Sequence, residues 1–215
     1  MASHVISKPA FLGRIAVVAG AALLLGGCAG AAPEPAASPD TTQSGTTSVS
    51  VSPTATATAM PAYKPASAKG PAQNVPLPVL PAVAKTETKE GLEAFTKYWF
   101  AVLSYAYETG DVELLKGVSG PDCAFCNGLV KNVSNAWKDD KWISGGRVKT
   151  PAVTGRALEN EPWQATVQVM QDEISIHNPD GTLTQDPTKA INVGSQVVAT
   201  FGRDGWTVTE LGLIR

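Results

Sequence analysis

All five tryptophans of this 215-residue chain lie between Trp99 and Trp206, which limits where a folded core can form. Residues 29–88 consist mostly of Pro, Ala, Ser and Thr instead. Such a segment buries too little apolar surface to offset the entropy lost on ordering, and its prolines interrupt any helical or strand period. We therefore expect one compact domain over residues 86–215 and a disordered tether over residues 28–85. Within the tether, only the run VPLPVLPAV is apolar enough to lie extended against the domain.

The N-terminus has the three parts of a secretory signal peptide. Lys8 and Arg14 precede the apolar run IAVVAGAALLL, and small residues follow it. This run is too short to span a bilayer comfortably, so residues 1–27 are predicted to be removed on export.

The ending Leu-Gly-Gly-Cys resembles the lipobox of bacterial lipoproteins, in which the cysteine is diacylated and becomes the first residue after cleavage. The resemblance implies a lipid (palmitate) anchor on Cys28, and a location on the extracytoplasmic face of the cell membrane. The alternative is a plain signal peptide or anchor with an incidental cysteine.

Three helices are predicted at the start of the domain. In the first, apolar side chains follow the 3.6-residue period at Leu92, Phe95, Trp99, Val102, Leu103 and Ala106. Thr86 or Thr88 is expected to cap this helix, and Gly110 to follow its last turn. Two further helices are predicted over residues 111–119 and from about residue 121 to 140.

The second half of the domain has the pattern of a β-sheet. Segments rich in Val, Ile and Thr are separated by turn signals and cover residues 146–158, 162–177, 190–202 and 205–214. In the second segment the apolar positions change from odd (Val167, Val169) to even (Ile174, Ile176), which predicts a β-bulge and a curved sheet. The predicted fold class is therefore α+β, with three N-terminal helices packed on a curved, four-stranded antiparallel sheet in the form of a cone.

This order of elements, closing with the strand GWTVTELGLI, resembles the nuclear-transport-factor-2-like (SnoaL-like, cystatin-like) superfold. More narrowly, YWFAVLSYAYETGDVELLKGVSGPDCAFC after a lipobox and a Pro/Thr-rich stalk is similar to a family of uncharacterised actinobacterial lipoproteins with a domain of unknown function. The resemblance covers about residues 86–215. It implies the cone fold but no particular activity, since the superfold includes both enzymes and binding domains.

Cys123 and Cys126 stand three residues apart near the start of the third predicted helix, and three interpretations compete. In an exported protein the pair is expected to oxidise to a structural disulfide. A redox centre is the second interpretation, because a helix N-terminus lowers a thiol pKa, but the βαβ context of thioredoxin-like enzymes is missing. A structural zinc site needs about four ligands, and the chain offers only His4 and His177 besides. We predict the disulfide and no metal site.

Enzymes of this superfold generally work in the pocket between helices and sheet, with a carboxylate or His as acid or base. The candidate pocket residues are Tyr98, Tyr105 and Tyr107 on the first helix and Asp172, Glu173 and His177 on the second strand. Each has a structural alternative, as a packing tyrosine, a solvated carboxylate or a residue at a hairpin end. No catalytic residue or cofactor is assigned, because no recognisable nucleophile–base order, phosphate loop or spaced carboxylate pair is present.

The formal net charge of −2 and the lack of a basic patch argue against nucleic acid as a partner. Three functions remain. The preferred one is a non-catalytic, membrane-tethered domain that binds an envelope protein or a small ligand. An exposed cone mouth with an aromatic lining and no titratable residue inside favours it. An isomerase or cyclase requires a deep pocket with a buried Asp, Glu or His. A thiol oxidoreductase requires an exposed cysteine pair.

Overall fold

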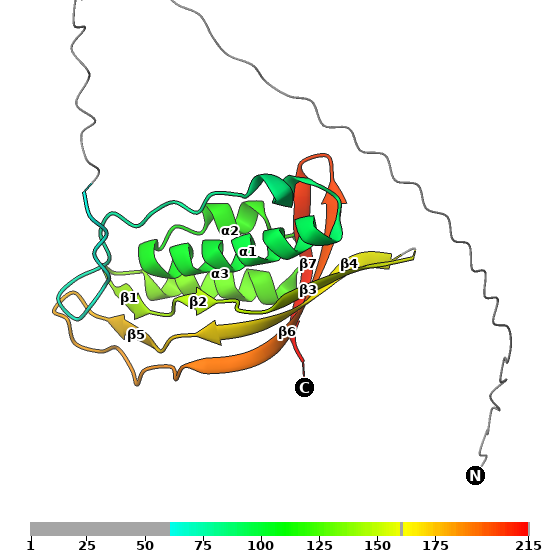
Figure 1. Ribbon diagram of the computed structural model, residues 1–215. Helices are drawn as coiled ribbons and strands as arrows, with labels where there is room; N and C mark the ends of the chain where they lie inside the picture. The colour runs from blue at the N-terminus through cyan, green and yellow to red at the C-terminus, as the bar shows by residue number, and fades with distance from the viewer. Residues whose placement is uncertain (1–60, 160, 215) are drawn as a thin grey trace, which may run out of the picture. The chain divides into compact units, whose positions relative to one another are not determined.

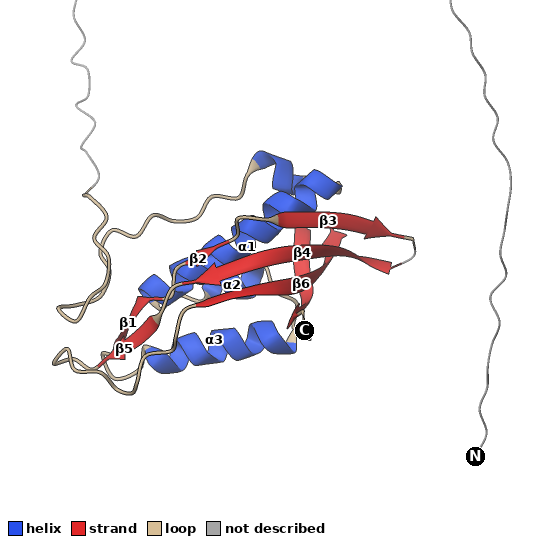
Figure 2. Ribbon diagram, turned by 60° about the horizontal axis from the view of Figure 1, so that its bottom comes forward, coloured by secondary structure: helices blue, strands red, loops and turns tan. Residues whose placement is uncertain are grey.

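The computed structural model describes residues 61–159 and 161–214, which place helices on one face of an antiparallel sheet (Figures 1 and 2). The helices are the 3-10 helix η1 (Ala82–Lys85), α1 (Lys89–Thr109), α2 (Glu113–Gly117) and α3 (Ala124–Ala136). The strands are β1 (Trp142–Gly145), β2 (Val148–Lys149), β3 (Val153–Leu158), β4 (Glu161–Gln171), β5 (Ile174–His177), β6 (Ile191–Gly202) and β7 (Gly205–Leu213). This mixed architecture confirms the predicted fold class. The predicted signal peptide, Cys28 and the tether up to residue 60 lie outside the described residues.

The first helix forms as its sequence predicts. Thr88 is the N-cap, and its Oγ1 accepts a hydrogen bond from the Gly91 amide at 3.0 Å. Gly110 follows the last turn with a φ of 76°, a left-handed conformation that glycine adopts without steric cost. Because the apolar stripe runs the full length of α1, this helix covers the sheet from one end to the other (Figure 1).

The four predicted strand segments supply the five strands of the main antiparallel sheet, β2, β3, β4, β6 and β7. Both β2 and β3 pair with β4, β4 pairs with β6, and β6 pairs with β7. The segment predicted as a single strand over residues 146–158 is divided into β2 and β3. Strand β1 was not predicted. It pairs with β5 in a separate two-stranded ladder, beyond the point where the second predicted strand divides into β4 and β5.

The break between β4 and β5 differs from the β-bulge that the parity change predicted. Gly145 pairs with Ile174 and Val148 pairs with Gln171, so the register is the same on both sides and no residue is inserted. On the facing chain, Gly145 and Gly146 have φ angles of 79° and 72°, a left-handed backbone that glycine adopts without steric cost. The register shifts of the sheet lie elsewhere, near Arg156 in the β3–β4 pair and near Val198 in the β6–β7 pair.

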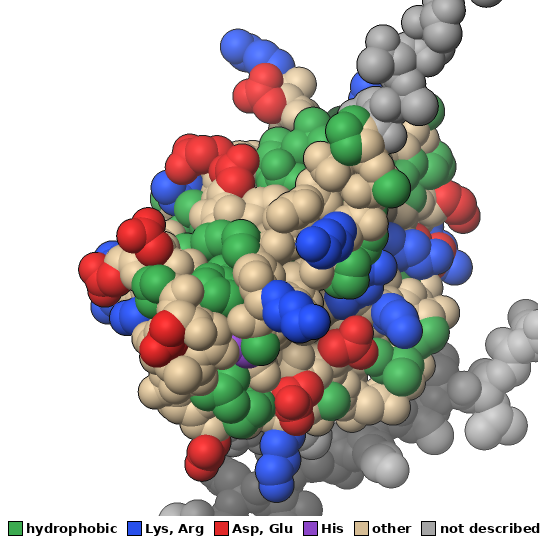
Figure 3. Space-filling model, turned by 90° about the vertical axis from the view of Figure 1, so that its left-hand side faces the viewer, with side chains coloured by type: hydrophobic (Ala, Val, Ile, Leu, Met, Phe, Trp, Pro, Cys, Tyr) green, Lys and Arg blue, Asp and Glu red, His purple; other side chains and the backbone are tan. Residues whose placement is uncertain are grey.

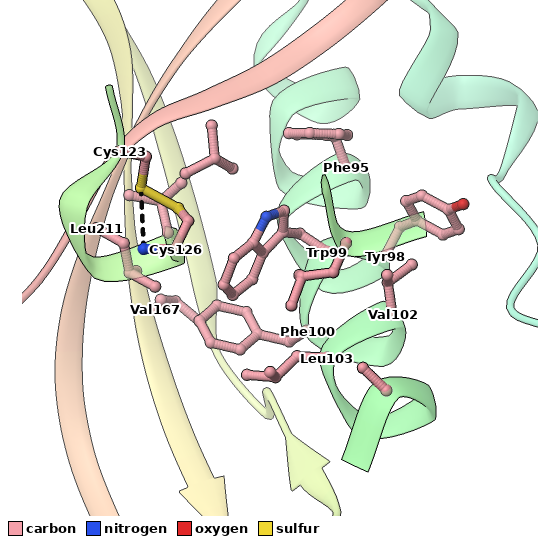
Figure 4. Packing of buried hydrophobic residues seen from close by; sticks show 14 of the residues in the cluster. Phe95, Tyr98, Trp99, Phe100, Val102, Leu103, Cys123, Cys126, Val167 and Leu211 are labelled. Carbon is pink, nitrogen blue, oxygen red and sulfur yellow. Dashed lines mark hydrogen bonds between the residues drawn. A yellow bond between two sulfur atoms is a disulfide. The ribbon is translucent and has the colours of Figure 1, made fainter. Parts of the chain in front are cut away.

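The core lies between α1 and the sheet. Figure 4 shows Trp99 and Phe100 of α1 pointing toward Val167 of β4 and toward the Cys123–Cys126 pair. The two α1 rings meet edge to face, with their centroids 5.0 Å apart. The outer face of the sheet has no helix on it (Figure 2), and β6 accordingly alternates buried and more exposed residues over much of its length.

Four of the tryptophans donate indole N–H hydrogen bonds to residues that are remote in the sequence. The acceptors are Ser119 Oγ for Trp99, the Tyr107 carbonyl for Trp137, the Ser67 carbonyl for Trp142 and the Thr86 carbonyl for Trp206, at 2.9 to 3.2 Å. Each bond satisfies a polar group on an otherwise apolar ring.

Residues 61–85, which we expected to belong to the tether, pack on the domain and form a segment that we call the strap. Lys64 and Gln73 exchange two backbone hydrogen bonds of 3.0 and 2.9 Å, which makes a small hairpin. Trp142 holds the hairpin through the Ser67 carbonyl, and Ala84 is fully buried. The folded part therefore begins upstream of residue 86, because partners that are remote in sequence supply the contacts that local composition does not indicate.

Gly145→Ala is expected to lower the free energy of unfolding by roughly 1–3 kcal/mol. The position is left-handed, and an added Cβ would collide with the Glu173 carbonyl oxygen. Urea denaturation followed by circular dichroism measures the change. Gly128→Ala is the matched control: Gly128 lies in α3 with open space at its Cβ position, so that variant should be neutral or stabilised. An unchanged midpoint for Gly145→Ala would contradict the role given to this turn.

Candidate functional site

A cavity of about 630 Å³ opens between α3 and the β1–β5 ladder. Its apolar lining comes from α3 and from the two strands, through Leu129, Val133, Ala136, Ile143, Ile174 and Ile176. Amide and hydroxyl side chains line the rest, at Asn132, Asn135, Gln171, Thr184, Gln185 and Thr188. The helical period of α3 explains the first group, since residues 129, 133 and 136 share one face of that helix.

Gly146 brings two sides of this cavity together. An added Cβ there would lie 2.9 Å from Ile174 Cγ1 and 3.3 Å from the Tyr107 ring, closer than ordinary packing allows. The glycine therefore lets the end of α1 and strand β5 approach each other closely.

The charges of the cavity lining are few. Its titratable members are Tyr107 and Lys141. Burial raises the pKa of Tyr107 to about 12, so this hydroxyl is neutral at physiological pH. The Lys141 amino group lies 3.4 Å from a carboxylate oxygen of Asp139, and this ion pair offsets its charge. Figure 3 shows the end of the domain where β1 and β5 lie, with acidic and basic side chains mixed among hydrophobic ones.

Cys123 and Cys126 are placed as a disulfide, with their Cα atoms 5.3 Å apart. Cys123 is the N-cap of α3, and its Sγ accepts a hydrogen bond from the Cys126 amide at 3.3 Å. Both residues are at most 1% exposed. An attacking thiolate has no access to a sulfur in this position, so the geometry suits a structural brace rather than a redox centre.

The three tyrosines proposed for the pocket do not gather in one place. Tyr107 lines the cavity. Tyr98 lies in a groove with Phe95 and Trp206, and burial raises its pKa. Tyr105 lines a depression together with residues 75–78 of the strap. Tyr98 and Tyr105 are seven residues apart, so they share a face of α1 but lie two turns from each other along the helix. Tyr107 points to another face, and the three residues therefore have different surroundings.

Asp172 and Glu173 are exposed at the break between β4 and β5, and neither lines the cavity. The two carboxylates are therefore better described as solvated surface groups than as pocket residues. Asp172 lies in a surface depression with Arg147 and Lys149.

His177 ends β5 and is 5% exposed. Its ring stacks on Trp142, with centroids 5.5 Å apart. Nδ1 lies 3.2 Å from the Gly181 carbonyl, which can only accept, so Nδ1–H is the donor there; Nε2 lies 2.7 Å from the Ser144 hydroxyl. His177 thus anchors a hairpin end and lies outside the cavity.

One polar cluster was missed by the sequence analysis. The Arg147 guanidinium donates to a carboxylate oxygen of the buried Glu108, at 3.1 Å from Nη2, and to the Tyr63 hydroxyl at 3.0 Å. The hydrogen bond with Glu108 raises the pKa of Arg147, and burial together with Glu108 raises that of Tyr63. The cluster joins the strap to α1. Nothing in the order of these residues along the chain indicates that they meet.

Within residues 61–159 and 161–214, no group of His, Cys, Asp and Glu side chains is arranged to hold a metal ion. In the same part of the chain, no helix combines the length and apolarity needed to cross a membrane.

The chain belongs to a family of unknown function (DUF6318), whose family model matches residues 61–212. The matched range begins with the strap, in agreement with the strap being part of the domain. No curated protein matches the chain.

Several solved structures are similar in fold. The intermembrane-space region of the chloroplast protein ARC6 has a TM-score of 0.42 at 11% identity, over 60% of this chain and 98% of that one. An uncharacterised protein with a cystatin-like fold from Caulobacter vibrioides has a TM-score of 0.37 at 14% identity, over 59% of this chain and 91% of that one. A domain of unknown function with a cystatin-like fold from Nostoc punctiforme has a TM-score of 0.36 at 15% identity, over 60% of this chain and 79% of that one.

Burial predicts that Cys123 and Cys126 resist modification in the folded protein. Treatment with a mild reductant and iodoacetamide should leave both unlabelled by mass spectrometry until denaturant is added. Lys131→Cys, at an exposed position on α3, is the matched control and should be labelled at once. Labelling of the native pair as fast as that control would contradict a structural role.

Proposed function

We propose that this protein is a lipoprotein anchored through Cys28 on the extracytoplasmic face of the cell membrane, and that its domain binds an apolar ligand without chemical conversion. The ligand site is the cavity between α3 and the β1–β5 ladder. This proposal combines the lipobox resemblance with the one observation that carries the binding role, namely the size and lining of that cavity.

The cavity has the properties of a small-molecule site. Its volume of about 630 Å³ falls within the range of roughly 300–1,000 Å³ typical of ligand pockets. Leu129, Ile174 and Ile176 are half-buried apolar side chains that remain partly accessible from the cavity. Covering such surfaces with an apolar ligand removes them from water, which favours binding by about 25 cal/mol per Å² covered. A concave site of this size suits a small ligand better than the flat surface of a protein partner.

The lining supports binding over an isomerase or cyclase reaction. General acid–base catalysis near neutral pH depends on a group whose pKa lies near the operating pH. The described residues that line the cavity include no Asp, Glu or His, and the pKa of Tyr107 is raised to about 12. The burial of Cys123 and Cys126 likewise counts against the thiol oxidoreductase.

Leu129→Trp is expected to fill the cavity and weaken ligand binding at least about tenfold, since the indole would occupy the volume that the ligand needs. The neutral fluorescent probe N-phenyl-1-naphthylamine, titrated into the protein, measures the affinity. Val79→Trp is the matched control, because Val79 is 81% exposed on the strap and the added indole leaves the cavity open. Circular dichroism checks that both variants fold. Equal probe affinity in wild type and a folded Leu129→Trp would refute the site, as would the lack of any binding to the wild type.

The anchor is tested separately. The mature protein isolated from bacterial membranes should begin at an acylated Cys28, which intact mass spectrometry detects as an added lipid mass. Cys28→Ser should release the protein from the membrane fraction, because a chain without its acyl groups loses about 0.8 kcal/mol of membrane affinity per CH₂. Retention of Cys28→Ser in the membrane fraction would contradict lipid anchoring and leave the cavity argument intact.

A further inference from the structure

Four carboxamide side chains at the cavity differ from the other amides of the described domain. Asn132, Asn135, Gln171 and Gln185 line the cavity, and none makes a side-chain hydrogen bond to another described residue. Elsewhere such bonds are the rule, at Asn74, Asn127, Asn178, Asn192, Gln164, Gln168 and Gln196. Gln73 on the strap is the exception. Asn132, Asn135 and Gln185 are exposed and Gln171 is half-buried, so the amides without a hydrogen bond to a described residue are concentrated at this one cavity.

These amides come from three separate parts of the chain. Asn132 and Asn135 lie on α3, Gln171 ends β4, and Gln185 lies in the segment between β5 and β6. Thr184 and Thr188 line the cavity from that same segment, and the Thr184 hydroxyl donates to the Ile176 carbonyl at 3.3 Å. The apolar lining formed by α3, β1 and β5 is therefore accompanied by neutral hydrogen-bonding groups from several elements.

The charge balance indicates which polar group the cavity would accept. Each carboxamide offers both donors and an acceptor, which matches hydroxyl groups better than a bare cation or anion. Tyr107 stays neutral, and the charged lining residue Lys141 has its counter-ion Asp139 3.4 Å away outside the lining, so cavity and rim together carry little net charge. An ionic head would have to give up water without a free counter-charge to replace it.

We infer that the ligand is an amphiphile with an apolar body and an uncharged, hydroxyl-rich head, such as an acylated or alkylated sugar. This inference rests on the proposed function and names the ligand class of the same cavity. The apolar body covers Leu129, Ile174 and Ile176, and the head groups bond to the amides around them.

Three probes with the same eight-carbon chain test the head-group preference: octyl glucoside, octanoate and octylammonium, each below its critical micelle concentration. Displacement of N-phenyl-1-naphthylamine from the full-length domain measures their affinities. Octyl glucoside should bind at least about tenfold more tightly than either ion. Equal affinities, or a preference for an ion, would overturn the inference while leaving the proposed function standing. Failure of the naphthylamine itself to bind would refute the proposed function instead.

A double variant assigns the preference to the amides. Asn132→Ala with Gln185→Ala removes two exposed carboxamides and should reduce the octyl glucoside affinity at least about threefold, with octanoate binding unchanged. Gln73→Ala is the matched control, since it removes an equally unbonded amide outside the cavity and should change neither affinity. A preference for the glucoside that survives the double variant would overturn the role given to these side chains.

Discussion

Two backbone hydrogen bonds join residues 146–147 to residues 172–173, at the break that divides β4 from β5. The Gly146 amide donates to the Glu173 carbonyl at 2.9 Å, and the Asp172 amide donates to the Arg147 carbonyl at 3.0 Å. They keep the β1–β5 ladder in register with the main sheet, although the two glycines turn the backbone into the left-handed region. The cavity depends on this arrangement, because its walls come from α3 on one side and from β1 and β5 on the other.

The strap depends on contacts of a second kind. Trp142 begins β1, and Arg147 lies between β1 and β2. Each donates a hydrogen bond to a strap residue, Trp142 to the Ser67 carbonyl and Arg147 to the Tyr63 hydroxyl. Stability of the strap is therefore coupled to the same end of the sheet that forms the cavity. Since the family model also begins at residue 61, the strap belongs to the domain and not to the predicted tether.

The sequence predicted the site less well than the fold. Asp172 and His177 were candidate pocket residues because acids and bases can be recognised from residue type alone. In the structure Asp172 is exposed to solvent, and His177 anchors the end of a hairpin. The residues that line the cavity look like ordinary core positions or surface amides. Leu129 and Ile174 follow the same apolar pattern as fully buried neighbours, so periodicity alone cannot separate a packed side chain from one beside a cavity.

Local patterns determined the capped helix α1, the strand segments and the α+β class, because helical and strand periods and turn residues act over a few neighbouring positions. They also placed Cys123 and Cys126 close enough to pair at the start of α3. Only the tertiary structure decided that the strap is folded and that β4 and β5 separate without a change of register. It also brought four amides that bond to no other described residue to the rim of one cavity. These features depend on contacts between residues far apart in the chain, and a pattern of neighbouring residues does not indicate which remote contacts form.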